Sequence, residues 1–174
     1  MRVFPVLAPV LAPMLASAFA VALLAAAPAL ADDDEFGAYL FKGSCDSFAP
    51  DAVVKDIGDL DREDDADKEW ARVSPDHAQT PNPVYVEDES TDRVTAEELA
   101  AGGFAIAVTE TDSPDSTVIA CGELPGGMTL PFVTDLQEVD NSSIAGRVAI
   151  EKHRKGLKIT TAAFAKESVP PLAR

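Results

Sequence analysis

The chain has 174 residues, of which 14 are Lys or Arg and 30 are Asp or Glu, so its formal net charge is −16. A surface this acidic repels nucleic acid and anionic lipid, and we expect the protein to bind neither. The length suits one domain with a substantial core, and 47% of the residues are hydrophobic.

The N-terminal segment has the pattern of a secretory signal peptide. Arg2 is followed by a long apolar stretch that ends in Ala-Leu-Ala at residues 29–31, directly before an acidic run. Signal peptidase recognises these features. A retained transmembrane helix, the alternative, needs about 20 apolar residues, and four prolines interrupt this stretch. We therefore expect a signal peptide at residues 1–31 and a secreted or periplasmic single domain at residues 32–174, with no membrane insertion after cleavage.

Acidic residues are concentrated at residues 56–69, which read DIGDLDREDDADKE. Such a run of like charges repels itself when buried, and the prolines at positions 75, 81 and 83 follow it without any periodic pattern. We therefore expect an acidic, proline-containing loop near residues 56–83.

The functional alternative for this loop is calcium binding, because calcium prefers carboxylate oxygens. The residues from Asp59 begin like an EF-hand loop, but the sixth position is Asp64 instead of Gly and the twelfth is Trp70 instead of Glu. A looser calcium site stays open as an alternative, and no other cofactor is expected.

One helix start stands out in the remaining chain. Thr95 and Glu98 have the spacing of a capping box, in which each side chain accepts a hydrogen bond from the backbone amide of the other residue. Gly102 and Gly103 end the helix, because glycine is preferred at helix C-termini. We expect a short helix near residues 96–101.

Alternation of apolar residues with period two predicts short strands elsewhere. It occurs at residues 104–108, at residues 117–121, and at residues 148–150 and 157–161 on either side of the turn residues 154–156. The last two segments predict a hairpin. Several short strands with little helix favour an all-β sandwich or barrel.

Cys45 and Cys121 are the two cysteines of the chain. An oxidising compartment permits them to form a disulfide, and we expect that bond. Chain entropy alone suggests that a bond closing so long a loop contributes roughly 4 to 5 kcal/mol before strain is subtracted. A metal-binding or catalytic thiol is the alternative, but there is no C-x-x-C motif and no histidine near either cysteine.

Motifs for catalysis are absent from the sequence, which has no G-x-S-x-G, no Walker loop and no H-E-x-x-H. The two histidines are His77, in the proline-containing region, and His153, beside a turn. Neither has a second His or Cys at ligand spacing, so we expect exposed loop histidines and no local zinc or copper site. Paired carboxylates do not discriminate in so acidic a chain, so no catalytic residue is predicted.

Two regions together resemble the signature regions of copper–zinc superoxide dismutase and of secreted dismutase-like proteins. Residues 38–45 (AYLFKGSC) resemble the segment H-x-H-E-G-x-C, and residues 102–109 (GGFAIAVT) lead to residues 120–124 (ACGEL), which resemble the segment A-C-G-[DE]-[IL]. The resemblance implies a Greek-key β-sandwich. It also implies a bond between Cys45 and Cys121, in agreement with the pairing expected from compartment and count.

A third segment, residues 141–163, resembles the G-x-A-x-[LF] hairpin of this family through the sequence GRVAIE at residues 146–151. In the dismutases that hairpin precedes the histidine strand, whereas here it follows the A-C-G segment. A circularly permuted strand order would explain the difference.

The metal ligands of the family do not carry over. The positions that match the two strand histidines are Tyr39 and Phe41, and the position that matches the later copper histidine is Thr109; the matching loop offers only His77. Redox cycling needs a copper held by several imidazoles. The resemblance therefore implies the fold and argues against the dismutase reaction.

The sequence thus favours a secreted, non-catalytic β-sandwich module that binds an unidentified protein or surface partner, and enzymatic activity is not expected. One alternative is an acidic calcium-binding protein outside the cytoplasm. The other is a residual copper or zinc redox enzyme that holds its metal with His77, His153 or other donors. The three hypotheses differ in the metal that they predict.

Overall fold

The computed structural model describes residues 36–62, 67–74, 81, 84–154 and 156–168, so the expected signal peptide at residues 1–31 lies outside the described part. Most of these residues belong to eight strands: β1 (Phe36–Lys42), β2 (Val53–Arg62), β3 (Val84–Thr91), β4 (Phe104–Thr109), β5 (Val118–Leu124), β6 (Phe132–Glu138), β7 (Ile144–His153) and β8 (Gly156–Ala165). The other elements are two α-helices and three single turns of 3-10 helix: α1 (Asp67–Val73), α2 (Ala96–Ala101), η1 (Cys45–Ser47), η2 (Pro50–Ala52) and η3 (Lys166–Ser168).

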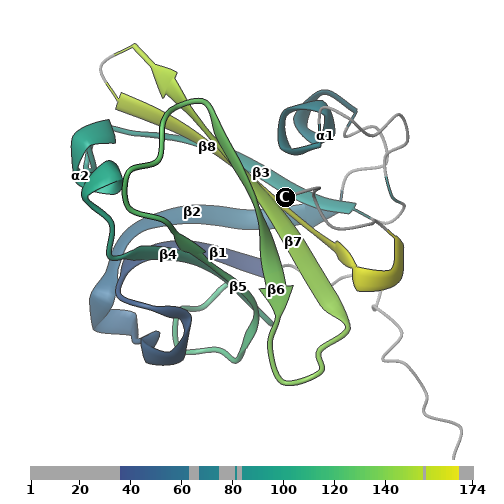
Figure 1. The fold of residues 1–174 in the computed structure, drawn as a ribbon. Helices are drawn as coiled ribbons and strands as arrows, with labels where there is room; N and C mark the ends of the chain where they lie inside the picture. Colours follow the sequence, from purple (N-terminus) through teal and green to yellow (C-terminus); the bar gives the residue numbers. More distant parts are fainter. Residues whose placement is uncertain (1–35, 63–66, 75–80, 82–83, 155, 169–174) are drawn as a thin grey trace, which may run out of the picture.

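The strands form one closed antiparallel barrel in the order β1-β2-β3-β8-β7-β6-β5-β4 (Figure 1). The expected all-β class is confirmed, but the expected sandwich is wrong, because β1 and β4 pair over six residue pairs and close the sheet on itself. Alternating residues predict strands without saying which edges meet, and closure depends on those edges.

The chain crosses one end of the barrel between β3 and β4, because β3 pairs with β8 whereas β4 pairs with β1. The helix α2 lies in this crossing (Figure 1), and its Leu99 is buried in the interior core together with Val94. The Glu98 amide donates to Thr95 Oγ1 at 3.2 Å, and the Thr95 amide donates to the Glu98 carboxylate at 2.8 Å. The short helix near residues 96–101 and its capping box are therefore confirmed.

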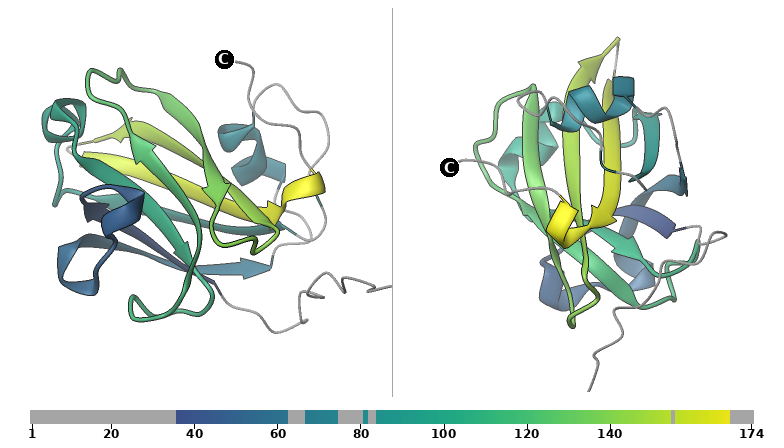
Figure 2. Two further views of the ribbon diagram at one scale, coloured as in Figure 1. Left: turned by 60° about the horizontal axis from the view of Figure 1, so that its bottom comes forward. Right: turned by 90° about the vertical axis from the view of Figure 1, so that its right-hand side faces the viewer.

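A second helix, α1, was not expected from the sequence. It covers the outer face of β3, β7 and β8 (Figures 1 and 2), where the Trp70 ring meets the edge of Phe164 with centroids 5.5 Å apart. Trp70 and Val73 are three residues apart, so they share one helix face, and both are buried. Burial of this apolar pair is what stabilises so short a helix in a sequence rich in charge.

The acidic segment also begins as a strand and not as a loop. β2 runs through Arg62 because Ile57 and Leu60 are buried inside the barrel, while Asp56 and Asp61 remain exposed. The loop expected near residues 56–83 is therefore wrong for residues 56–62 and for α1. His77 lies outside the described residues.

Side chains pack on both faces of the barrel wall. The interior core takes residues from all eight strands, among them Leu40, Ile106 and Ile150. A second cluster lies under α1, and a third lies on the outer face of β1, β4 and β5. The predicted hairpin is confirmed as β7 and β8, which pair over ten residue pairs from Ile144 with Ala165 to His153 with Gly156.

The expected disulfide between Cys45 and Cys121 is present, with the two Cα atoms 5.8 Å apart. It ties η1 to β5 across the third cluster, where Phe41, Ala105 and Ala107 pack beside Cys121. The bond thus fixes the chain that follows β1 against the β4–β5 hairpin, at the place where the barrel closes.

Loss of this bond is expected to lower the free energy of unfolding strongly. The cysteines are 76 positions apart, and a cross-link of that span contributes about 4 kcal/mol in the chain-entropy model. We predict that Cys45→Ser lowers the melting temperature by about 10 °C or more, as seen in thermal melts followed by circular dichroism. Reductant should bring the wild-type protein to the same melting temperature and leave the variant unchanged. Equal melting of oxidised wild type and variant would contradict the prediction.

Candidate functional site

The three positions that match metal ligands lie along the outer face where β1 pairs with β4, with Thr109 near Tyr39 and Phe41 farther along the ladder. In the register, Gly37 lies opposite Thr109, and Tyr39 and Phe41 follow on the same face of β1. A Cβ atom built on Gly37 would lie 2.7 Å from Thr109 Oγ1 and 2.9 Å from the Tyr39 hydroxyl. The glycine therefore leaves room for these two side chains to close over the strand, and Tyr39, Phe41 and Thr109 are all buried.

Each of the three side chains is engaged by the protein itself. The Tyr39 hydroxyl donates to Asp112 Oδ1 at 3.1 Å, and Thr109 Oγ1 donates to the carbonyl oxygen of Thr111 at 2.8 Å. Phe41 meets the edge of Phe48 with ring centroids 4.9 Å apart. Burial, followed by the charge of Asp112, raises the pKa of Tyr39, so its phenol stays protonated.

This donor set does not fit copper or zinc. A phenylalanine ring cannot ligate, a protonated phenol and a threonine hydroxyl are poor ligands for either metal, and no imidazole stands among them. Among the residues that the structure describes, no group of three or more His, Cys, Asp and Glu side chains could hold a metal ion. The looser calcium site considered for the acidic segment has no such group in the described part of β2 and α1.

His153 is exposed at the end of β7. It lines a cleft of about 220 Å³ with Asp92, Thr91 and Leu157. The expectation of an exposed histidine is confirmed for His153, and its partner in the third functional hypothesis, His77, lies outside the described residues. The structure therefore gives His153 no second imidazole within its described part.

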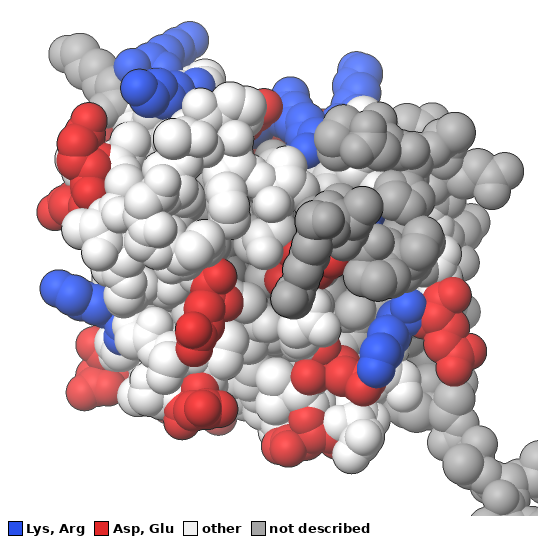
Figure 3. All heavy atoms as spheres, in the orientation of Figure 1, with Lys and Arg blue, Asp and Glu red and all other residues white. Residues whose placement is uncertain are grey.

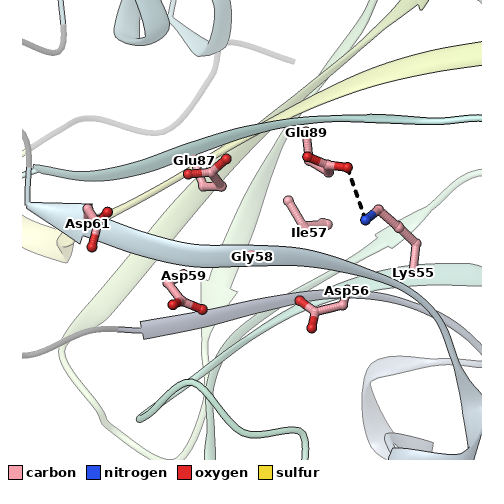
Figure 4. Close-up of a pocket in the computed structure, with 8 residues that line it drawn as sticks. All are labelled: Lys55, Asp56, Ile57, Gly58, Asp59, Asp61, Glu87 and Glu89. Atoms are coloured by element: carbon pink, nitrogen blue, oxygen red, sulfur yellow. Dashed lines mark ion pairs between the residues drawn. The ribbon is translucent and has the colours of Figure 1, made fainter.

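An acidic pocket opens between β2 and β3, and the sequence analysis did not foresee it. Within the described residues, the two strands pair at Asp61 with Val86 and at Arg62 with Tyr85 and nowhere else. Beyond these pairs they separate around a cavity of about 440 Å³ (Figure 4). Five carboxylates and one ammonium group line it: Asp56, Asp59, Asp61, Glu87, Glu89 and Lys55.

Two of the carboxylates belong to the inward side of the barrel wall. Glu87 and Glu89 lie two and four residues after Tyr85 on β3, so they share its face of the strand, and Tyr85 is part of the interior core. In Figure 4 they lie between the two strands, where Lys55 Nζ reaches Glu89 Oε1 at 3.1 Å. Burial is the main cause that raises the pKa of Glu87, and the neighbouring charges of Asp88 and Glu89 add to it. Glu87 has no ion-pair partner within the described residues.

The rest of the molecular surface is unevenly charged. In Figure 3 the acidic side chains of one face gather in its lower part, and an uncharged area lies above them. The net charge of the whole chain is −16, so the molecule attracts cations.

A buried arginine beneath α1 is the other polar feature that the sequence analysis missed. Arg147 has no exposed surface; its Nε donates to Asp135 Oδ1 at 2.7 Å, its Nη1 donates to Ser74 Oγ, and its guanidinium lies 5.8 Å from the Trp70 ring centroid. A charged residue at an outward position between the apolar residues of β7 was the available signal. With its charge paired to Asp135 and its Nη1 bonded to Ser74, Arg147 anchors α1 and Ser74 to the barrel.

Comparison with protein-family models, with curated proteins and with solved structures found no match for this chain. Within the described residues, no helix has the length and apolar character needed to span a membrane.

The raised pKa of Glu87 predicts how the stability of the protein depends on pH. Because the pKa of Glu87 is raised on folding, the folded chain binds its proton more tightly than the unfolded chain does, and the ionised carboxylate opposes folding at neutral pH. We predict that Glu87→Gln raises the melting temperature at pH 7. The gain should shrink as the pH falls through the raised pKa and vanish below the ordinary value of 4.5.

Glu123→Gln is the matched control, since it removes one negative charge from the exposed face of β5. An equal gain in the two variants would show that net charge alone is responsible and would contradict the local explanation. Thermal melts at pH 7 and pH 4 measure both effects.

The buried ion pair of Arg147 with Asp135 leads to a second prediction about stability. Arg147→Met leaves the Asp135 carboxylate, 16% exposed, beside an apolar side chain, and loss of one partner of a buried pair costs about 3 kcal/mol or more. We expect a large fall in the urea midpoint. The double variant Arg147→Met/Asp135→Leu removes both members of the ion pair, so it should regain part of the loss. A double variant as unstable as the sum of Arg147→Met and Asp135→Leu would contradict the pairing.

Proposed function

We propose that the chain acts outside the cytoplasm as a non-catalytic binding module, on a superoxide dismutase-like barrel whose metal positions have been filled by other side chains. The observation that carries the proposal is the burial of Tyr39, Phe41 and Thr109 in packing and hydrogen bonds. A metal would need imidazoles at these positions and space around them, and the chain supplies neither there.

The strand arrangement supports the family assignment. The segments that resemble the two dismutase signatures lie on β1, β4 and β5, which are adjacent in the barrel, and the cysteines of these segments are bonded. The resemblance implied this bond.

A circular permutation is supported by where the chain begins and ends in the barrel. β1, β2, β3 and β8 are successive antiparallel neighbours, so β8 ends at the same end of the barrel at which β1 begins. Joining these ends and opening the chain elsewhere would move the β7–β8 hairpin ahead of β1. That is the order that the dismutases have.

The disulfide supports a location outside the cytoplasm, because such bonds persist in oxidising compartments. We propose cleavage of residues 1–31, which would leave 13 Lys and Arg against 30 Asp and Glu and a formal charge of −17. The partner is proposed to be a protein or surface outside the cytoplasm that tolerates or complements this charge.

Mass and metal content of the exported protein test this function. The full chain is expressed without a histidine tag and exported to a bacterial periplasm. We predict that its intact mass is that of a chain that starts at Asp32 and has both cysteines oxidised. After incubation with copper and zinc and desalting, elemental analysis should find far less than one metal per chain.

His153→Ala is the control for adventitious binding, because this exposed histidine is the simplest place for a stray copper ion. One tightly held copper or zinc per chain that survives this substitution would overturn the non-catalytic assignment. An uncleaved, reduced chain would overturn the proposed location.

A further inference from the structure

We infer that two copies of the chain associate, related by a twofold axis, through the face that carries the connection between β5 and β6. The inference goes beyond the proposed function, because it depends neither on export nor on the positions that match metal ligands. It rests on three features of this face: an uncharged centre with half-buried apolar side chains, a basic border, and an acidic border on the opposite side.

The centre of the face is a stretch of chain without charge. Residues 124–134, the uncharged segment, read LPGGMTLPFVT, although 25% of the whole chain is charged. Met128, Leu130 and Phe132 pack against the interior core but are only half-buried, so part of each apolar side chain meets water. Thr129, between them, is exposed. Exposed apolar patches mark interaction sites, and protein interfaces commonly have an apolar centre and a polar rim.

The end of α2 supports the uncharged segment and widens the uncharged area. The Gly127 amide donates to the carbonyl oxygen of Ala100 at 2.7 Å, and a Cβ atom built on Gly102 would lie 3.2 Å from Gly126 Cα. Residues 99–103 carry no charge, and the carboxylates of α2 lie in its first turn, at the other end of the helix. The connection between β5 and β6 and the end of α2 therefore form one uncharged surface.

The turn between β7 and β8 supplies the basic border. Lys152 and Arg154 are exposed, and within the described residues neither forms an ion pair, whereas five other basic side chains are paired with carboxylates. Lys152 lies opposite Leu157 of the interior core, so the two side chains share the inward face of the hairpin. A Cβ atom built on Gly156 would lie 2.1 Å from the carbonyl oxygen of Thr91. The turn is thus held against the chain that leads into α2, beside the uncharged area.

The strand β5 and the turn before it supply the acidic border. Glu123 is exposed and directly precedes the uncharged segment, and Glu110 and Asp115 are exposed in the turn from which β5 comes. Figure 3 shows basic side chains above the uncharged area of this face and acidic side chains below it. The face is therefore positive at one border, uncharged at its centre and negative at the other border.

A face of this kind is complementary to itself. A twofold contact brings the same patch of both copies together, and it places the basic border of each copy against the acidic border of the other. Lys152 and Arg154 then meet carboxylates that they lack within the described part of their own chain, and the two uncharged centres cover each other. Two copies with a formal charge of −16 repel one another, but physiological salt screens that repulsion beyond about 8 Å.

Sedimentation velocity of the exported, oxidised protein tests the association. It is measured at about 150 mM salt, where the net charge is screened, over protein concentrations from about 1 to 200 μM. We expect a monomer at low concentration and a dimer at high concentration, with no larger species because a twofold contact is closed. A protein that stays monomeric throughout, or that forms open-ended assemblies, would overturn the inference.

A charge at the centre of the face should separate the copies. Thr129→Glu brings two like charges together near the twofold axis, so it should weaken the dimer by at least about tenfold. Ala71→Glu is the matched control, since it adds the same charge to the exposed side of α1 and should change the dissociation constant less than about twofold. Melting temperatures confirm that both variants fold. Equal weakening by the two variants would show that net charge alone governs association and would refute the assignment of the face.

Exchange of charge between the borders tests the twofold arrangement. Lys152→Glu and Glu123→Lys each set like charges against each other at both borders, so each variant alone should dimerise about tenfold more weakly. An equal mixture should form a heterodimer with nearly the affinity of the wild type, because opposite charges again face each other. Sedimentation of the mixture, beside that of each variant alone, measures this recovery. A mixture no more dimeric than its components would overturn the arrangement. None of these results changes the mass or metal content that tests the proposed function, so the two proposals can fail separately.

Discussion

The pairing of β1 with β4 is the constraint on which the rest of the structure depends. Six residue pairs join strands that are far apart in sequence, and this junction turns an eight-stranded sheet into a barrel without a free edge there. The disulfide lies beside it and holds the chain that leaves β1 against β5. Long-range pairing of this kind is costly in chain entropy, and the covalent link reduces that cost by restricting the unfolded chain.

Closure at β1 and β4 also sets the surroundings of Tyr39, Phe41 and Thr109. The outer face of these strands carries Tyr39, Phe41 and Thr109, and it is sealed by Phe48, by η1 and by the disulfide. A site that held a metal would keep polar donors directed at one point. Here these positions contribute apolar contacts and short hydrogen bonds to their own neighbours, so the region stabilises the barrel.

Local sequence patterns were enough to predict the elements whose residues decide their own conformation. The capping residues Thr95 and Glu98 define α2, alternation defines the β7–β8 hairpin, and two cysteines in one chain define the bond. Local patterns could not predict the closure of the barrel, the helix α1 or the acidic pocket. Each of them depends on a surface made by distant strands: α1 forms because Trp70 finds Phe164, and the pocket forms because β2 and β3 part after two pairs.

The barrel wall holds three polar side chains, Arg147, Glu87 and Thr161, and their surroundings differ. Arg147 is matched by Asp135, Ser74 and the Trp70 ring, so the chain itself offsets the cost of burying its charge. Glu87 and Thr161 face each other across β3 and β8 with no such compensation in the described residues. Arg147 shows that this barrel can satisfy a buried polar group where it holds one. Glu87 therefore opposes folding at neutral pH, whereas the pairing of Arg147 with Asp135 supports the packing of α1 on the barrel.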